Sequence, residues 1–392
     1  MSESSAEVRR RVSSVELFFD LVFAFAFTQV TTLWLDQSTW AGLGRGFLVL
    51  LVLWWVWASF AWLTNMANAE TDLVLGAMLF ATAALFVAAL AVPEAFGAHR
   101  LIFGVALQIV VIAFVGLYLL VSRSEPGQFR AVLRLSCTAA PGVTLVLAAA
   151  FVSAQIRPVL WAAAIVVGLF GPNLAGLRGW RVYPAHFAER HGLILIIAIG
   201  ESLSAIGFGA RYTQLSAGVI AAAVLGLIVA ASFWLAYFDF AAGGIEQLLA
   251  QRRGEERIAL ARDAYTYLHL PMVAGVLLFA FAMRTALVHV GSHLELIPAL
   301  ALCCGSALYL LAFVAVRWRA TRRFGYGRPV AALALALLLP LAISVPALVA
   351  LGAVAGLWLG LHGYELIWWR EARARRRAPA VAAQRPPGAP GD

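Results

Sequence analysis

The sequence contains no lysine, and charged side chains of any kind are scarce. All 29 basic residues of the 392-residue chain are arginines, and charged residues make up 12% of the sequence against 62% hydrophobic residues. A water-soluble domain carries roughly a quarter of charged residues, so this composition excludes a domain solvated by water alone. The mean hydropathy of +0.87 indicates an integral membrane protein whose main solvent is lipid.

The sequence also has few cysteines and no nucleotide-binding motif. The three cysteines, Cys137, Cys303 and Cys304, fall within apolar runs and offer neither a disulfide framework nor metal-ligand spacing. Neither a Walker sequence nor a dinucleotide glycine pattern is present, which argues against nucleotide-driven work. We therefore expect no cofactor and no metal. The first apolar run has spanning length and lacks a small-residue cleavage site, so we interpret it as a helix rather than a signal peptide.

Apolar runs of membrane-spanning length are abundant, and they predict an all-α polytopic helical bundle of about twelve transmembrane helices. The predicted spans are 15–35, 43–64, 70–92, 98–121, 131–153, 156–172, 190–209, 215–239, 263–288, 294–316, 329–345 and 347–369. The sixth and eleventh are short, and the last two are divided at Pro346.

The arginines support this count. With a cytoplasmic N-terminus and alternating helices, only five arginines lie on the outer side, which leaves 24 of 29 on the inner side. The five are Arg45, Arg100, Arg157, Arg211 and Arg284. Because basic residues accumulate on the cytoplasmic side, we expect a multi-pass protein of the plasma (inner) membrane with both termini in the cytoplasm. The basic loops lack interleaved aromatics, so we expect anionic lipid headgroups, and no nucleic acid, as their partners.

A weak internal similarity divides the chain into two parallel six-helix halves. Glu16 opens the first span and Glu189 precedes the seventh, while Asp72 and Asp263 stand at the inner ends of the third and ninth. Such halves would be related by an axis along the membrane normal. The predicted organisation is a cytoplasmic N-terminus (1–14), a first half (15–172), a cytoplasmic loop (173–189), a second half (190–369) and an Arg-rich, then Ala/Pro-rich disordered tail (370–392).

The loop at 240–262 has mixed charge and helical character, which suits an amphipathic helix at the surface. In the last span, Gly352, Gly356 and Gly360 are spaced four residues apart. That spacing predicts close helix contact, either within the fold or between two copies of the chain.

Two acids interrupt the first apolar run, VELFFDLVFAF. Glu16 and Asp20 lie one helical turn apart, and Phe23 and Phe27 continue the same face. Ionisable side chains in spans are costly and normally face a partner, a bundle interior or water. We expect one of the two acids to pair with Arg190 or Arg262. The alternative is a role limited to balancing charge at the inner interface.

The seventh span, in HFAERHGLILIIAIGES, carries a further acid at greater depth. Glu201 shares a face with Arg190 and lies about 17 Å beyond it along the helix axis. This position predicts a side chain that faces the bundle interior, within a cavity or beside a polar residue of another helix such as Thr28, Gln29 or His269. Glu189, Arg190 and His191 are either part of the same polar path or an interfacial hydrogen-bonded clasp.

His269 opens the ninth span two residues before Pro271, which frees a backbone carbonyl that needs a donor. The imidazole is therefore either a proton carrier or a hydrogen bond between helices.

The blocks VELFFDLVFAFAFTQV and HFAERHGLILIIAIGES resemble the bacterial low-temperature-requirement A (LtrA) family of multi-pass membrane proteins, and YLHLPMVAG adds to the likeness. The resemblance covers nearly the whole chain. It implies that eight residues occupy family motif positions, and it implies no particular biochemical activity. These are Glu16, Phe19, Asp20, Glu189, Arg190, His191, Gly200 and Glu201.

The stretch RVSSVELFFDLVFAFAFT is more distantly similar to the first-helix motif of potassium channels of the transmembrane protein 175 family. That similarity implies a layout in which the first helix of each half lines a central path. Phe19 replaces the motif serine, Glu16 is an additional acid, and the seventh span has no aspartate aligned with Asp20. Potassium selectivity is therefore not implied.

These residues lead to one main functional hypothesis, a transporter or channel in which acids line an intramembrane path for a cation or proton. The residues that we expect along it are Glu16, Asp20, Asp72, Glu189, Arg190, His191, Glu201, Asp263 and His269. One alternative is an intramembrane enzyme acting on a lipid or prenyl-like substrate, with Glu201, His269 or His191 as acid or base. Another is a structural or assembly protein whose charges only hold helices together.

Overall fold

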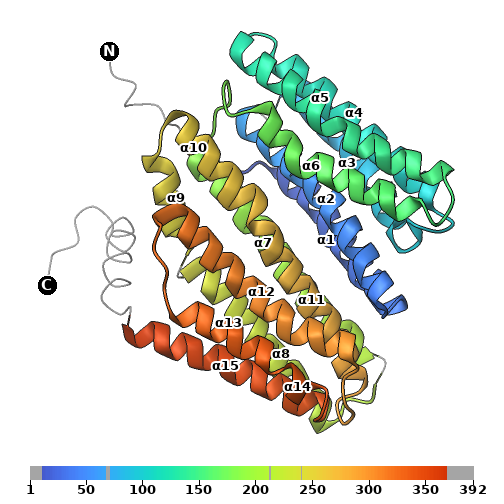
Figure 1. The fold of residues 1–392 in the computed structure, drawn as a ribbon, viewed down its shortest axis with the longest axis vertical. Coiled ribbons are helices and arrows are strands. Elements are labelled where there is room, and N and C mark those ends of the chain that lie inside the picture. Colours follow the sequence, from blue (N-terminus) through green and yellow to red (C-terminus); the bar gives the residue numbers. More distant parts are fainter. Residues whose placement is uncertain (1–10, 68–70, 212, 240, 369–392) are drawn as a thin grey trace, which may run out of the picture.

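The computed structural model describes residues 11–67, 71–211, 213–239 and 241–368, and the secondary structure of these segments is helical apart from one isolated bridge (Figure 1). The predicted tail (370–392) and the first ten residues lie outside the described residues.

The first half consists of six long helices and two short 3₁₀ turns. They are α1 (Ser14–Asp36), α2 (Trp40–Met66), α3 (Asp72–Leu90), η1 (Val92–Glu94), α4 (Arg100–Ser122), α5 (Pro126–Ala148), η2 (Ala149–Phe151) and α6 (Arg157–Ala175).

The second half contains two π-helical segments, η3 and η4, among its α-helices. Its elements are α7 (Pro184–Arg211), α8 (Ala217–Trp234), η3 (Leu235–Asp239), α9 (Ala242–Gln251), α10 (Gly254–Leu260), η4 (Ala261–Tyr267), α11 (His269–Val288), α12 (Leu296–Thr321), α13 (Gly327–Leu337), α14 (Leu339–Ala342) and α15 (Ala347–Trp368). The amphipathic helix expected between the eighth and ninth spans is present as α9 and α10.

Eleven helices of the described segments are long and apolar enough to cross a membrane. The predicted all-α polytopic membrane bundle is therefore confirmed. The eleventh predicted span is the exception, because it forms the shorter α13–α14 pair over 327–342. At 1.5 Å per residue, these 16 residues extend about 24 Å, which is less than the ~30 Å hydrocarbon core.

The α13–α14 pair packs against α12 and α15. The turn that follows it, before α15, lies against the loop between α11 and α12. There the Ala347 amide donates to the Ser292 carbonyl at 2.8 Å, and His293 and Pro346 form the isolated bridge. The predicted division at Pro346 is present, since α14 ends at Ala342 and α15 begins at Ala347.

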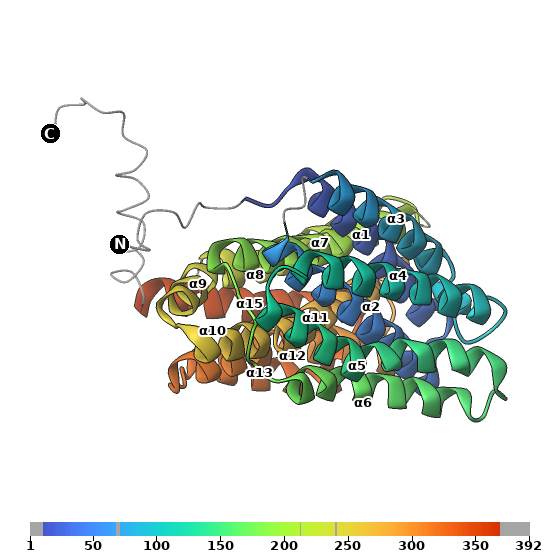
Figure 2. The same cartoon turned by 90° about the horizontal axis from the view of Figure 1, so that it is seen from above.

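The helices of the two halves pack in the same order. In the first half α1 contacts α2 and α3, and α3, α4, α5 and α6 follow one another as neighbours. In the second half α7 contacts α8 and α11, and α11, α12, α13 and α15 follow in the same way. The halves meet mainly where α1 lies against α7, with α2 and α11 beside them (Figures 1 and 2).

Helix α7 begins at Pro184, six residues before the predicted start, so Glu189 belongs to the helix rather than to the loop. Proline suits the first turn of a helix because its missing N–H has no partner there. Hydropathy places the start too late because His186 and Arg190 are polar. Both are nevertheless buried in the bundle, where they meet partners from other helices.

Candidate functional site

Polar side chains join α1 and α7, and three of their contacts have the same sequence separation. His186 contacts Glu16, Arg190 contacts Asp20, and Glu201 contacts Thr31, and each pair is separated by 170 residues. A constant difference in residue number means that the two helices run parallel and in register. We refer to this polar contact between α1 and α7 as the central interface.

The inner level of the central interface is a buried ion cluster around Arg190. One guanidinium nitrogen lies 3.0 Å from Asp20 Oδ1 and the other 3.5 Å from Glu16 Oε1. The Trp57 indole N–H also donates to Asp20 Oδ1, at 2.9 Å. Arg190 and Asp20 are 0% exposed and Glu16 is 1% exposed, so the ions are removed from solvent.

Glu16 is held from both sides of α1. The backbone N–H of Ser13, the N-cap residue, donates to Glu16 Oε2 at 2.8 Å in a capping box. On the other side, His186 Nε2 lies 3.2 Å from Glu16 Oε1. The Asn65 amide nitrogen lies 3.2 Å from His186 Nδ1. Because an amide NH₂ only donates, this contact assigns the imidazole proton to Nε2, which then donates to Glu16.

The inner level therefore contains two carboxyl groups and one guanidinium, with a histidine whose contacts need no extra proton. Burial of an unbalanced carboxylate is costly, so one further proton or cation would neutralise the charge of the cluster. Asp20 Oδ2 and Arg190 Nε are buried and have no hydrogen-bond partner among the described side chains and backbone. The expected ion pair with Arg190 is confirmed. Arg262, the other expected partner, instead pairs with Asp263.

The deeper level is built on Glu201, which is 4% exposed. The Thr31 hydroxyl donates to Oε1 at 2.8 Å, and the Thr28 hydroxyl donates to Oε2. Of the three partners expected for Glu201, Thr28 is in contact with it. His269 bonds instead to Ala264 and Tyr237, and Gln29 is not among the hydrogen-bond partners of Glu201 in the described residues. Arg284 donates to the neighbouring Thr32 hydroxyl at 3.1 Å, which places a guanidinium on the same stretch of α1.

Two histidines form an aromatic cluster beside the inner level. His269 Nδ1 lies 2.9 Å from the Ala264 carbonyl and its Nε2 lies 2.9 Å from the Tyr237 hydroxyl. The carbonyl can only accept, so Nδ1 carries the proton and the tyrosine donates to Nε2. The His191 ring lies 5.3 Å from that of His269 and 4.8 Å from that of Trp57. The cluster thus reaches Asp20 through Trp57.

Both π-helical segments contribute to this cluster. Segment η3 carries Tyr237, and η4 carries Ala264 and Tyr265. A π-helix widens one turn by an extra residue and is frequent at functional sites. Here the wide turns direct a carbonyl and a hydroxyl to the two nitrogens of His269. His191 Nε2 and the Tyr265 hydroxyl are buried and have no hydrogen-bond partner within the described part of the chain.

The other candidate residues lie outside the central interface. Asp72 and Glu189 are exposed at the surface of the fold. Asp263 bridges two arginines, with 2.8 Å to Arg262 and 2.7 Å to Arg319.

Sequence reasoning missed five polar residues of these sites, namely Thr31, Trp57, Asn65, His186 and Tyr237. Two of them carried a usable signal, since Thr31 lies one turn after Thr28, and His186 lies one turn before Arg190 as Glu16 lies one turn before Asp20.

Fold and site together define a polytopic membrane protein whose two halves meet at a buried charged interface. The chain belongs to the bacterial low temperature requirement A protein (LtrA) family, whose model matches residues 11–362. It is similar to a protein of Rhizobium meliloti (strain 1021), named as the uncharacterized protein RA0937. The two are 29% identical over 301 residues, which covers 71% of this chain and 70% of that protein. No solved structure matches the chain.

Proposed function

We propose that this LtrA-family protein is a transporter that moves a proton or an inorganic cation along the central interface. The observation that carries the proposal is the pair of buried carboxylate levels on parallel helices, one at Asp20 and one at Glu201. Ionisable residues inside membrane spans generally mark ion or proton pathways.

The two levels offer different chemistry to a cation. At the inner level, Glu16 and Asp20 share one guanidinium, so a proton or cation would complete the charge balance there. At the deeper level, Glu201 is surrounded by the hydroxyl oxygens of Thr28 and Thr31. Carboxylate and hydroxyl oxygens suit hard cations, and hydroxyl groups can also pass protons.

Burial of both levels favours a carrier over an open channel in the described conformation. Asp20 and Glu201 are closed to solvent, so an ion reaches them only when the halves move. Rigid-body rocking of repeated halves around a central site is a common transport motion. The parallel contact of α1 and α7 lies where such a motion would open the site alternately to each side.

The test is ion flux in vesicles that contain the purified protein, driven in turn by a pH gradient and by gradients of monovalent and divalent cations. We expect Glu201→Gln to fold normally and to lower flux to the level of protein-free vesicles, because the amide keeps the shape but does not titrate. Glu189→Gln is the matched control, since Glu189 is an exposed acid on the same helix. Unchanged flux in Glu201→Gln, or no gradient-driven flux in the wild type, would contradict the proposal.

The same variants separate transport from a purely structural role. If Glu201 only anchors α1 to α7, Glu201→Gln should behave as the wild type in every assay, whereas Glu201→Ala should lower the folded yield. An intramembrane enzyme would instead show altered lipid composition in deletion cells, restored by the wild-type gene.

A further inference from the structure

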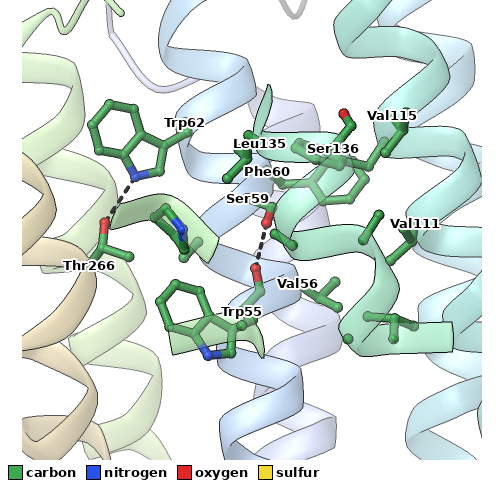
Figure 3. A pocket seen from close by; sticks show the side chains of 18 of the residues that line it. Trp55, Val56, Ser59, Phe60, Trp62, Val111, Val115, Leu135, Ser136 and Thr266 are labelled. Carbon is green, nitrogen blue, oxygen red and sulfur yellow. Dashed lines mark hydrogen bonds between the residues drawn. The ribbon is translucent and has the colours of Figure 1, made fainter. Parts of the chain in front are cut away.

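A groove separate from the central interface lies between α2 on one side and α4, α5 and α6 on the other, and residues of α10 and η4 complete its lining. Helix α2 packs against α4 and α6, while α5 packs against those two helices and faces α2 across the groove. Figure 3 shows side chains of α2 on one side, and of α4 and α5 on the other, turned toward the space between them.

The lining of the groove is almost entirely apolar. Valines, alanines and aromatic rings form most of it, and Ser59 and Ser136 contribute the hydroxyls of α2 and α5. Its volume of about 120 Å³ is comparable to the roughly 150 Å³ of a dry engineered cavity that takes up benzene. The space therefore suits a segment of one hydrocarbon chain rather than a fused ring system.

The length of the groove matches one leaflet of a bilayer. Its lining residues on α2 run from Val52 to Trp62. Ten residues of helix rise about 15 Å, which is half of the ~30 Å hydrocarbon core. The Trp62 end is the end where α2 stops at Met66, so the groove runs from one membrane interface toward the bilayer centre.

A positively charged group stands at the Trp62 end. Arg262 lines the groove there, together with Trp180 and Leu177 of the loop before α7. Asp263 lies between Arg262 and Arg319, so this triad of two guanidinium groups and one carboxylate carries a net positive charge. An apolar channel of one leaflet's length with a positive end complements a chain that carries an anionic headgroup.

One donor inside the groove also lacks a partner. The Trp55 indole N–H is buried without a hydrogen-bond partner among the described residues. That edge of the ring faces Gly168 of α6, where an added Cβ would lie 3.1 Å from it. Buried tryptophans usually find an acceptor, whereas this one lies against the α6 backbone.

We propose that this groove binds one acyl chain of an anionic phospholipid, with the phosphate beside Arg262. This site is independent of the proposed ion path. Bound lipid would also fill the space between α2 and α5, which no side chain of the described residues closes.

Photo-crosslinking tests the proposal on the full-length protein in mixed micelles. The probe is phosphatidylglycerol with a diazirine in the middle of one acyl chain, and labelled peptides are identified by mass spectrometry. We expect labels on residues 52–62 and 135–146. Ala140→Phe should remove most of this labelling because Ala140 lines the groove. Ala162→Phe, at an exposed site on α6 outside the lining, should not.

A headgroup comparison tests the charge. A phosphatidylcholine probe with the same chains should label about fivefold less, because its choline cation cancels the phosphate charge and weakens the attraction to one arginine. Arg262→Gln should abolish the difference, while Arg178→Gln, with its side chain 89% exposed at the same end, should keep it. If Ala140→Phe does not fold, Ser136→Leu provides a smaller obstruction. Labels spread over the lipid-facing surface and unchanged in the folded obstructed variant would overturn the proposal, as would equal labelling by the two headgroups.

Discussion

At the scale of single residues, the structure explains why an apolar helix tolerates two acids. Glu16 and Asp20 share Arg190, and each acid has a second donor, His186 for Glu16 and Trp57 for Asp20. Each carboxylate therefore exchanges water for protein donors when α1 enters the bundle. Breaking such a buried pair on one side is far more costly than replacing both partners.

This asymmetry predicts the behaviour of Asp20→Asn. The change removes the carboxylate that bonds the Arg190 guanidinium and the Trp57 indole but leaves Glu16 to balance the guanidinium. We expect a loss of about 1.5–3 kcal/mol of stability, seen as a lower melting temperature in detergent. Adding Arg190→Gln should lower stability further, because Glu16 then stays buried without its arginine partner. Asp72→Asn, at an exposed acid, is the control. A double variant as stable as Asp20→Asn would show that burial of Glu16 does not depend on Arg190.

A second residue-scale prediction concerns the hydrogen bond between Tyr237 and His269. Tyr237→Phe leaves His269 Nε2 buried without its donor, and a buried polar atom left unpaired costs roughly 1–3 kcal/mol. We expect a measurable drop in melting temperature, whereas Tyr326→Phe should have no effect because Tyr326 is 84% exposed. Equal melting temperatures for Tyr237→Phe and the wild type would mean that the imidazole finds another donor.

Some residue contacts were predictable from the sequence and others were not. An acid within an apolar run needs a partner. Arg190 of α7 lies at the depth of Asp20 on α1, and Thr28 of α1 lies at the depth of Glu201 on α7. Trp57 and Asn65 come from α2, and their approach depends on how α2 rotates against α1. Hydropathy does not encode that rotation.

At the scale of elements, the spans were predictable because lipid requires about 20 apolar residues per helix. The π-helical segments η3 and η4 were not, since one inserted residue in a turn leaves composition and hydropathy unchanged. The early start of α7 was also missed, because His186 and Arg190 are polar by sequence and buried only through partners on α1 and α2.

The register of α1 against α7 makes a prediction at this scale. Asp20 and Thr28 both contact α7, so Ala24 between them should face Ile194 at the same separation of 170 residues. In a protein whose three native cysteines are replaced by alanine, Ala24→Cys with Ile194→Cys should form a disulfide, which needs Cα atoms about 4.4–6.8 Å apart.

Leu21→Cys with Ile194→Cys is the matched control, because Leu21 is 60% exposed on the other side of α1. The crosslink is read as a mobility shift that reductant reverses. Crosslinking of the control pair at the same rate would reject the parallel register.

At the scale of the whole molecule, the constant separation of 170 residues supports the predicted repeat. Two helices related by an axis along the membrane normal run parallel, and where they meet on the axis, equivalent positions face each other. Glu16 with His186 and Asp20 with Arg190 fit that geometry. The partners are complementary rather than identical, since α1 supplies the acids of the inner level and α7 the bases. That difference is why so few residues revealed the repeat in the sequence.

Whether the two ends of the chain lie on the same side of the membrane depends on the α13–α14 pair. Eleven spans alone would leave the two ends of the chain on opposite sides, whereas a crossing by α13–α14 brings them to the same side. The contact of Ala347 with Ser292 places the end of α14 beside the loop after α11, opposite the end of α12. We therefore expect the pair to cross despite its length, with the membrane thinned or its flanking groups extended toward the interface.

This leads to a prediction of topology. Both termini should be cytoplasmic, because 24 of the 29 arginines then lie on the inner side. A green fluorescent protein fused after Asp392 should fluoresce, and alkaline phosphatase fused there should be inactive. The reverse is expected for fusions in the loop at Gly291, between α11 and α12. An active phosphatase after Asp392, together with an inactive one at Arg322, would mean that α13–α14 does not cross. Active phosphatase at both positions would mean that the orientation is inverted, and the fusion at Gly291 checks this, since only inversion would make the phosphatase inactive there.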